Sequence, residues 1–211
     1  MKHFKNISTL IFDFGGVLVN LDRNRCIMNF KELGVDNIDH FLNDFAQKGV
    51  FMALEKGQIS PEEFRLEIRK MTSKTVSDAE IDAAWCSFLV NVPAEKLDLL
   101  LKLRENFRIV MLSNTNSIHF PFAEESYLGH TAGDKSPYFD KYYLSFEMKM
   151  AKPDLDIFEA LLDSEGIDAN RCLFLDDGPK NIEQAKTLGL QTYLVSENEN
   201  LDFLLNPETW N

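Results

Sequence analysis

Acidic side chains directly follow two apolar runs that lie far apart in the sequence. Asp13 comes after residues 9–12, and the pair Asp176 and Asp177 comes after residues 171–175. Both runs are rich in branched and aromatic residues and lead into glycines, as buried strands that end in a tight turn do. Parallel strands present their carboxyl ends along one edge of a sheet, so we expect these carboxylates to share a crevice. Taken singly, each aspartate could equally be a turn former.

A third apolar run ends on groups that could bind an anion. Residues 107–112 precede Ser113 and Asn114, and Lys152 opens a predicted helix together with Pro153. Hydroxyl and backbone N–H groups at a strand-to-helix turn bind phosphate oxygens, and a lysine supplies a point charge that offsets a phosphoryl group. A solvated lysine at a helix end is the alternative for Lys152.

Three carboxylates in one crevice need a counter-charge. Two unit negative charges about 4 Å apart repel by roughly 4 kcal/mol at an effective dielectric of about 20. Oxygen ligands without histidine or cysteine favour Mg²⁺, and Mg²⁺ in turn favours phosphate substrates. We therefore expect Mg²⁺ as the cofactor and a small phosphorylated metabolite as the substrate.

The elements that must position these residues alternate along the second half of the chain. Strands are predicted at 107–112, 142–146, 171–175 and 191–195, with helices at 94–105, from Lys152 to Gly166, and up to Gly189. This alternation predicts an α/β fold, a Rossmann-like three-layer sandwich with a parallel sheet between helices. Residues 118–141 have no sustained period, so we expect loops and a short helix there. His119 and His130 are expected to be solvated loop residues, with contact to the substrate as the alternative.

Residues 23–92 show helical spacing throughout. Ser60 and Ser77 each precede a glutamate by three positions, which is the pattern of a capping box. We expect no strand in this region and interpret it as a helical bundle inserted after the first strand. The predicted domains are an α/β catalytic core, residues 1–20 and 93–211, and a helical cap, residues 21–92.

Composition narrows the range of partners. The chain has 211 residues, 22 Lys and Arg against 34 Asp and Glu, and a net charge of -12. No basic stretch could follow a nucleic-acid backbone or an anionic membrane, and no apolar run approaches the roughly 18 residues of a bilayer span. We expect a cytoplasmic enzyme, monomer or homodimer, with no protein partner inferred. Without Cys-x-x-Cys spacing, the cysteines are expected to be buried free thiols: Cys26, Cys86 and Cys172.

Four short segments together resemble a known family. Residues 13–17, 112–114, 151–154 and 175–178 match, in order and spacing, the four motifs of the haloacid dehalogenase-like superfamily, in the branch with a helical cap after the first motif. The resemblance spans essentially the whole chain. Within the superfamily the chain is most similar to bacterial sugar-phosphate phosphatases of the glucose-1-phosphatase type, through the Asp-x-Gly start, Asp22, Arg25, Gly57 to Ser60, and residues 112–116.

This resemblance implies a nucleophile and a metal site. Asp13 would attack phosphorus and form an aspartyl-phosphate. Mg²⁺ would be held by the Asp13 carboxylate, the Gly15 carbonyl and Asp177, while Asp176 would assist as a metal residue through water or by holding the ligands in place.

The same resemblance implies a phosphate-binding set. Ser113, Asn114 and Thr115 would bind the phosphoryl oxygens, and Lys152 would neutralise Asp13 and the incoming charge. We therefore expect a hydrolase that acts on phosphate monoesters, with a sugar phosphate as its substrate.

The sequence departs from the family pattern at Gly15. Most phosphatases of the superfamily carry a second aspartate there as general acid and base, and such a group contributes roughly 10²- to 10⁴-fold in rate. Either another group, for which Asp22 is a candidate, replaces it, or the leaving group needs little help. A sugar that leaves from its anomeric oxygen meets the second condition, which favours a sugar 1-phosphate.

Two other functions fit parts of the pattern. Dehalogenases of the superfamily also lack the second aspartate, but they replace it with a bulky aromatic residue and have no use for Asp176 and Asp177 as metal residues. A phosphate- or partner-binding module that has lost turnover would not need Asp13 as a nucleophile.

Overall fold

The computed structural model describes residues 3–42, 47–129 and 135–210. At its centre is a sheet of five parallel strands in the order β5-β4-β1-β6-β7. Their bounds are β1 Thr9–Phe12, β4 Arg108–Ser113, β5 Lys141–Leu144, β6 Cys172–Asp176 and β7 Gln191–Leu194. The predicted parallel sheet is therefore confirmed, and the central strand β1 lies between the two strands that also end on polar groups.

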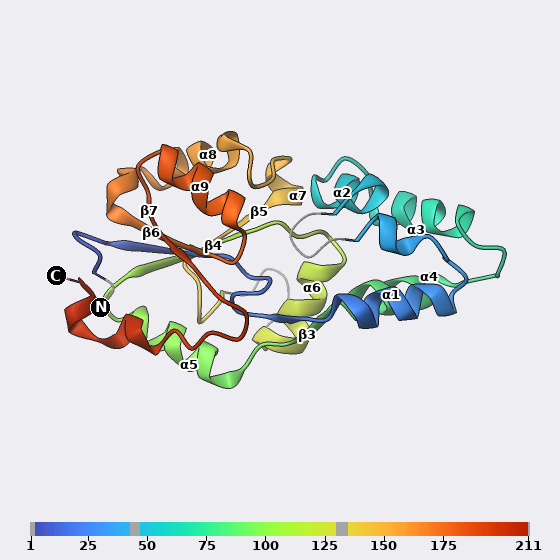
Figure 1. Ribbon diagram of the computed structural model, residues 1–211, viewed down its shortest axis with the longest axis horizontal. Helices are drawn as coiled ribbons and strands as arrows, with labels where there is room; N and C mark the ends of the chain where they lie inside the picture. The colour runs from blue at the N-terminus through green and yellow to red at the C-terminus, as the bar shows by residue number, and fades with distance from the viewer. Residues whose placement is uncertain (1–2, 43–46, 130–134, 211) are drawn as a thin grey trace.

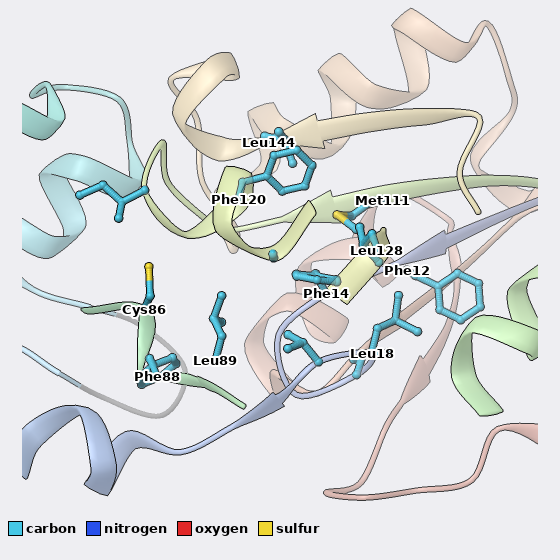
Figure 2. Close-up of a cluster of buried hydrophobic side chains, with 14 of the residues drawn as sticks. Phe12, Phe14, Leu18, Cys86, Phe88, Leu89, Met111, Phe120, Leu128 and Leu144 are labelled. Carbon is cyan, nitrogen blue, oxygen red and sulfur yellow. The ribbon is translucent and has the colours of Figure 1, made fainter. Parts of the chain in front are cut away.

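Helices cover both faces of this sheet, which gives three layers (Figure 1). Strand residues alternate between the faces, so that Ile11 and Val110 pack against α8 and α9, whereas Leu10 and Ile109 pack toward α5. The helices are α5 Ala94–Leu103, α8 Leu155–Glu165 and α9 Pro179–Thr187. Figure 2 shows part of one cluster, in which Phe12, Met111 and Leu144 come from three strands, and Phe14 and Leu18 from the loop after β1.

Four further helices lie together at one end of the molecule (Figure 1). They are α1 Arg23–Glu32, α2 Gly49–Glu55, α3 Pro61–Lys70 and α4 Asp78–Cys86. Both predicted capping boxes are present, with Ser60 and Ser77 accepting from the third helical N–H of α3 and α4. Phe51 and Trp85 are fully buried between these helices, with ring centroids 4.9 Å apart. The division into a core and a cap at the stated boundaries stays a prediction.

A two-stranded ribbon joins these helices to the sheet. Strand β2, Asn20–Leu21, pairs antiparallel with β3, Leu89–Asn91. The prediction that residues 23–92 contain no strand was therefore wrong, because a three-residue strand formed by pairing with a distant segment leaves no periodicity in the sequence. Arg25 fixes the ribbon, since its guanidinium donates to the carbonyl oxygens of Ser87 and Leu89 at 2.7 and 2.8 Å.

The segment before β5 is more helical than the sequence indicates. It contains α6, His119–Ala123, and a π-helical turn, Glu124–Leu128, while a further short helix α7, Ser145–Met148, follows β5. His130 lies outside the described residues. The cysteines are buried and free, as predicted. Among the described residues, none of the helices combines the length and the hydropathy that a membrane span requires.

Candidate active site

The polar groups at the ends of β1, β4 and β6 meet in one cavity. The sheet register sets Phe12 beside Met111 and Leu175, so the residues that follow these strands reach the same edge. Most of the site residues predicted from the sequence line the cavity: Asp13, Gly15, Ser113, Asn114, Thr115, Lys152 and Asp177. Asp176 is fully buried directly beneath them.

Lys152 is the electrostatic centre of this group. Its ammonium nitrogen lies 2.9 Å from Asp13 Oδ1 and 2.6 Å from Asp176 Oδ2, and it donates to the carbonyl oxygen of Leu112 at 2.9 Å. Burial alone would lower the pKa of Lys152, but the two carboxylates raise it above its ordinary value. The lysine is therefore a buried cation, and the alternative of a solvated helix-end lysine is wrong.

Asn114 holds the backbone of Lys152. Its side-chain carbonyl accepts from the Lys152 N–H at 2.9 Å, and its amide donates to the Lys152 carbonyl at 2.8 Å. This double contact uses the amide to position the lysine, a task that the sequence did not reveal. The Thr115 N–H donates to Ser145 Oγ at 3.0 Å, so it is occupied as well.

The three aspartates form a cluster that suits a divalent cation. One carboxylate oxygen from each of Asp13, Asp176 and Asp177 lies within 4.8 Å of the others. Burial, together with the neighbouring carboxylates, raises the pKa of Asp13 well above its usual range. Burial and the charge of Asp176 raise the pKa of Asp177 to about 6. Both shifts show that burial and mutual repulsion disfavour the ionised carboxylates despite Lys152, so a further cation would stabilise them, and hard oxygen ligands of this kind fit Mg²⁺.

Asp176 and Asp177 stand in different environments. Asp176 Oδ1 accepts from the Gly178 N–H at 2.7 Å and from Asn181 Nδ2 at 2.8 Å, while its other oxygen contacts Lys152. Asp177 instead lies against Gly16, whose φ is +71° and whose added Cβ would lie 2.1 Å from Asp177 Oδ2. Only a glycine allows this close approach, so the first loop is shaped around the Asp177 carboxylate.

Two titratable side chains in the cavity come from elements other than the predicted strand ends. Glu55, the last residue of α2, and His119, the first residue of α6, both line it. The expectation of a solvated His119 was wrong, because the ring is buried, lies 4.1 Å from the Trp85 ring and contacts the Trp85 carbonyl oxygen through Nε2 at 3.0 Å. Burial lowers the pKa of His119 to about 4, so its ring is neutral at pH 7.

Asp22, the suggested substitute for the missing acid, does not line this cavity. Its carboxylate accepts from the Arg25 N–H at 2.9 Å and so caps α1. A cap of this kind is a structural task. The backbone of His119 is held by Asn116, whose side-chain oxygen accepts from the His119 N–H at 2.9 Å.

Comparisons with known proteins agree with this geometry. Residues 7–189 match the haloacid dehalogenase-like hydrolase family. The D-ribitol-5-phosphate phosphatase of Bacteroides thetaiotaomicron is 34% identical over 187 residues, which cover 89% of this chain and 91% of that protein. A haloacid dehalogenase family enzyme of the same species, solved with magnesium and inorganic phosphate, is 47% identical with a TM-score of 0.88, and the match covers 95% of this chain and 100% of that one.

A third comparison gives the same result. A predicted haloacid dehalogenase-like family hydrolase from Porphyromonas gingivalis is 36% identical in sequence. Its solved structure matches with a TM-score of 0.83, and the match covers 92% of this chain and 94% of that one. The family match, the similarity over nearly the full length and the clustered motif residues are consistent with one another. The chain belongs to the haloacid dehalogenase-like hydrolase family.

Proposed function

We propose that this hydrolase is a Mg²⁺-dependent phosphatase that acts on a small phosphorylated metabolite through an aspartyl-phosphate on Asp13. The observation that carries the proposal is the buried contact of Lys152 with Asp13 and Asp176 at 2.9 and 2.6 Å. A cation fixed beside a carboxylate orients it and offsets the charge of an incoming phosphate dianion. Binding alone would not need a carboxylate aimed into the cavity at this point.

The metal would be held by the Asp13 carboxylate, the Gly15 carbonyl and Asp177. When bound, Mg²⁺ neutralises the charge on the transferring phosphoryl group and lowers its repulsion from Asp13. Asp176 keeps Lys152 and the loop at Gly178 in position, because both of its oxygens are hydrogen-bonded to protein donors. This division of work explains the two adjacent aspartates at the end of β6, with Asp176 as its last residue and Asp177 directly after it.

The phosphoryl oxygens would be bound at the end of β4. The Ser113 hydroxyl and the Asn114 N–H lie at the start of a turn, where N–H groups favour anions. The Thr115 N–H already donates to Ser145 Oγ, so Thr115 would contribute through its side chain. The Asn114 side chain contributes indirectly, since it holds both backbone polar groups of Lys152. Asp13 would attack phosphorus, and water would later release phosphate from it.

For the substrate class we propose a polyol or sugar phosphate. Support comes from the 34% identical relative that is named for D-ribitol 5-phosphate. An ester of this kind carries its phosphate on a primary carbon, in contrast to the sugar 1-phosphate that the missing acid at Gly15 favours. The rates of phosphate release from the two ester types therefore distinguish the two substrate hypotheses.

The test is phosphate release by the purified protein from D-ribitol 5-phosphate and from 1-, 5- and 6-phosphates of sugars, with Mg²⁺ and with EDTA. We expect release only with Mg²⁺ and none from Asp13→Asn. A preference for the 1-phosphates would contradict the polyol assignment while leaving the phosphatase intact. Chloride release from a haloacid in the presence of EDTA would identify a dehalogenase, and binding of phosphate esters without turnover would identify a binding module.

A cytoplasmic location and a monomeric or homodimeric state stay predictions. Fractionation of cells and light scattering of the purified protein test them.

A further inference from the structure

A phosphatase that releases a primary alcohol needs a proton donor, and the loop after β1 does not supply one. An alkoxide is a poor leaving group, and a general acid contributes roughly 10²- to 10⁴-fold to such a step. Gly15 has no side chain, and Asp22 caps α1 outside this cavity. The donor must therefore come from another element that borders the cavity.

Glu55 is the carboxylic acid that α2 brings to this place. Its side chain is partly buried and lines the cavity that also contains Asp13, Lys152 and Asp177. Within residues 3–42, 47–129 and 135–210, no hydrogen bond or ion pair to the Glu55 carboxylate is found. The side chain is therefore available to a ligand in the cavity, unlike Asp176, whose oxygens are both engaged.

The backbone of Glu55 is fastened to the same structure that forms the phosphate-binding turn. Ser145 Oγ donates to the Glu55 carbonyl oxygen at 2.6 Å and accepts from the Thr115 N–H at 3.0 Å, so one hydroxyl links the two segments. Two residues later, Gly57 has a φ of +60°, and an added Cβ would lie 2.1 Å from the Phe146 carbonyl oxygen. This close approach brings the end of α2 directly onto the backbone of α7.

A salt bridge adds to this attachment. Lys56 Nζ lies 3.2 Å from an Asp154 carboxylate oxygen, and Asp154 directly precedes α8, two residues after Lys152. The backbone at the end of α2 is thus held by contacts from α7 and from the start of α8. These contacts bring Glu55 to the cavity that Asp13 also lines, although the two residues belong to different parts of the fold.

We propose that Glu55 is the general acid and base of this enzyme, the group that protonates the leaving oxygen in place of the absent side chain at position 15. The assignment rests on the proposed phosphatase function. It gives α2 a catalytic residue at its last position, directly before the Gly57 to Ser60 segment that forms part of the family resemblance.

The charges around Glu55 agree with this role. Burial and the nearby Asp13 carboxylate raise the pKa of Glu55 to about 8, so the acid carries its proton at pH 7. The other titratable groups that line the cavity are Lys152, which already contacts two carboxylates, Asp177, and the neutral ring of His119.

The reaction balances with one proton that Glu55 gives and later recovers. In the first step an Asp13 oxygen bonds to phosphorus, the bond to the ester oxygen breaks, and that oxygen takes the bond pair and the Glu55 proton. In the second step a water oxygen bonds to phosphorus while its proton passes to the Glu55 carboxylate. The bond between phosphorus and Asp13 breaks, which returns the bond pair to the carboxylate and releases phosphate.

The experiment compares Glu55→Gln with wild type on two esters in rapid mixing with Mg²⁺. For D-ribitol 5-phosphate we expect the first step to slow by roughly 10²- to 10⁴-fold, because the leaving oxygen must be protonated. For p-nitrophenyl phosphate we expect a burst of nitrophenol at close to the wild-type rate, followed by slow turnover, because nitrophenolate leaves without a proton. Glu55→Asp should recover part of the lost rate.

Glu62→Gln is the matched control, since it removes the same charge from an exposed side chain of the neighbouring helix α3. It should leave both reactions unchanged. The wild-type rate with D-ribitol 5-phosphate should fall above about pH 8, where Glu55 loses its proton, and this decline should be absent in Glu55→Gln.

An equal loss with both esters, or no loss with either, would overturn the assignment. The first would show that Glu55 only shapes the site, and the second that the proton comes from elsewhere. A wild-type protein that transfers phosphate from neither ester contradicts the proposed function itself, and the assignment with it.

Discussion

Gly16→Ala should disable the metal site through one added methyl group. The Cβ would lie 2.1 Å from Asp177 Oδ2, and Cβ atoms essentially never lie closer than 3.0 Å to another heavy atom. The carboxylate must therefore retreat by about 0.9 Å, and a misplacement of about 1 Å in a catalytic group can cost on the order of 10²-fold in rate. We expect a loss of that size in kcat/KM, equivalent to about 2.7 kcal/mol, together with weaker Mg²⁺ binding.

A matched variant separates the clash from backbone strain. Gly166 follows α8 with a φ of +62°, close to the +71° of Gly16, but its added Cβ would meet nothing within 4 Å. Gly166→Ala should therefore lower the free energy of unfolding by about 1 kcal/mol and leave activity unchanged. Calorimetric Mg²⁺ titrations and steady-state kinetics of both variants provide the test. Wild-type Mg²⁺ affinity in Gly16→Ala would refute the proposed role of Asp177.

Three further predictions follow from the same contacts. Lys152→Met should lower kcat by roughly 10²- to 10³-fold. Without Mg²⁺ it should also lower the free energy of unfolding in urea by about 3 kcal/mol, because Asp13 and Asp176 lose their cation. The control Lys186→Met, at an exposed position, should change neither quantity, and a fully active Lys152→Met would contradict the charge argument. Mg²⁺ affinity measured by calorimetry should weaken between about pH 7 and pH 5, because protons compete for Asp177 below its pKa of about 6; an affinity independent of pH would exclude Asp177 as a ligand. EDTA should abolish phosphate release and added Mg²⁺ should restore it, whereas full activity in EDTA would show that no metal takes part.

The sheet and most of the candidate site could be predicted because they follow from local signals. Each apolar run is long enough to indicate a strand, and the alternation with helices implies a parallel sheet whose carboxyl ends meet. That reasoning alone brings Asp13, Ser113 and Asp177 together, as the structure does. The resemblance to known motifs adds roles to these residues, and the roles stay predictions.

Contacts made by distant segments could not be predicted from the same signals. Glu55 reaches the cavity only because Ser145 and Phe146 fix the end of α2, and no local pattern encodes that docking. The local sequence predicts a solvent-exposed His119 in a polar loop, but the ring is buried because it stacks on Trp85, which comes from a distant helix. Strand β3 likewise exists only through its pairing with β2.

The central claim is that Asp13 accepts the phosphoryl group, and rapid acid quench followed by peptide mass analysis tests it most directly. Wild-type protein mixed with p-nitrophenyl phosphate and Mg²⁺ should carry one added phosphoryl group on the peptide that contains Asp13, and EDTA or Asp13→Asn should eliminate it. Phosphate release with Asp13 unmodified at every time point, or with the phosphoryl group on another residue, would contradict the account.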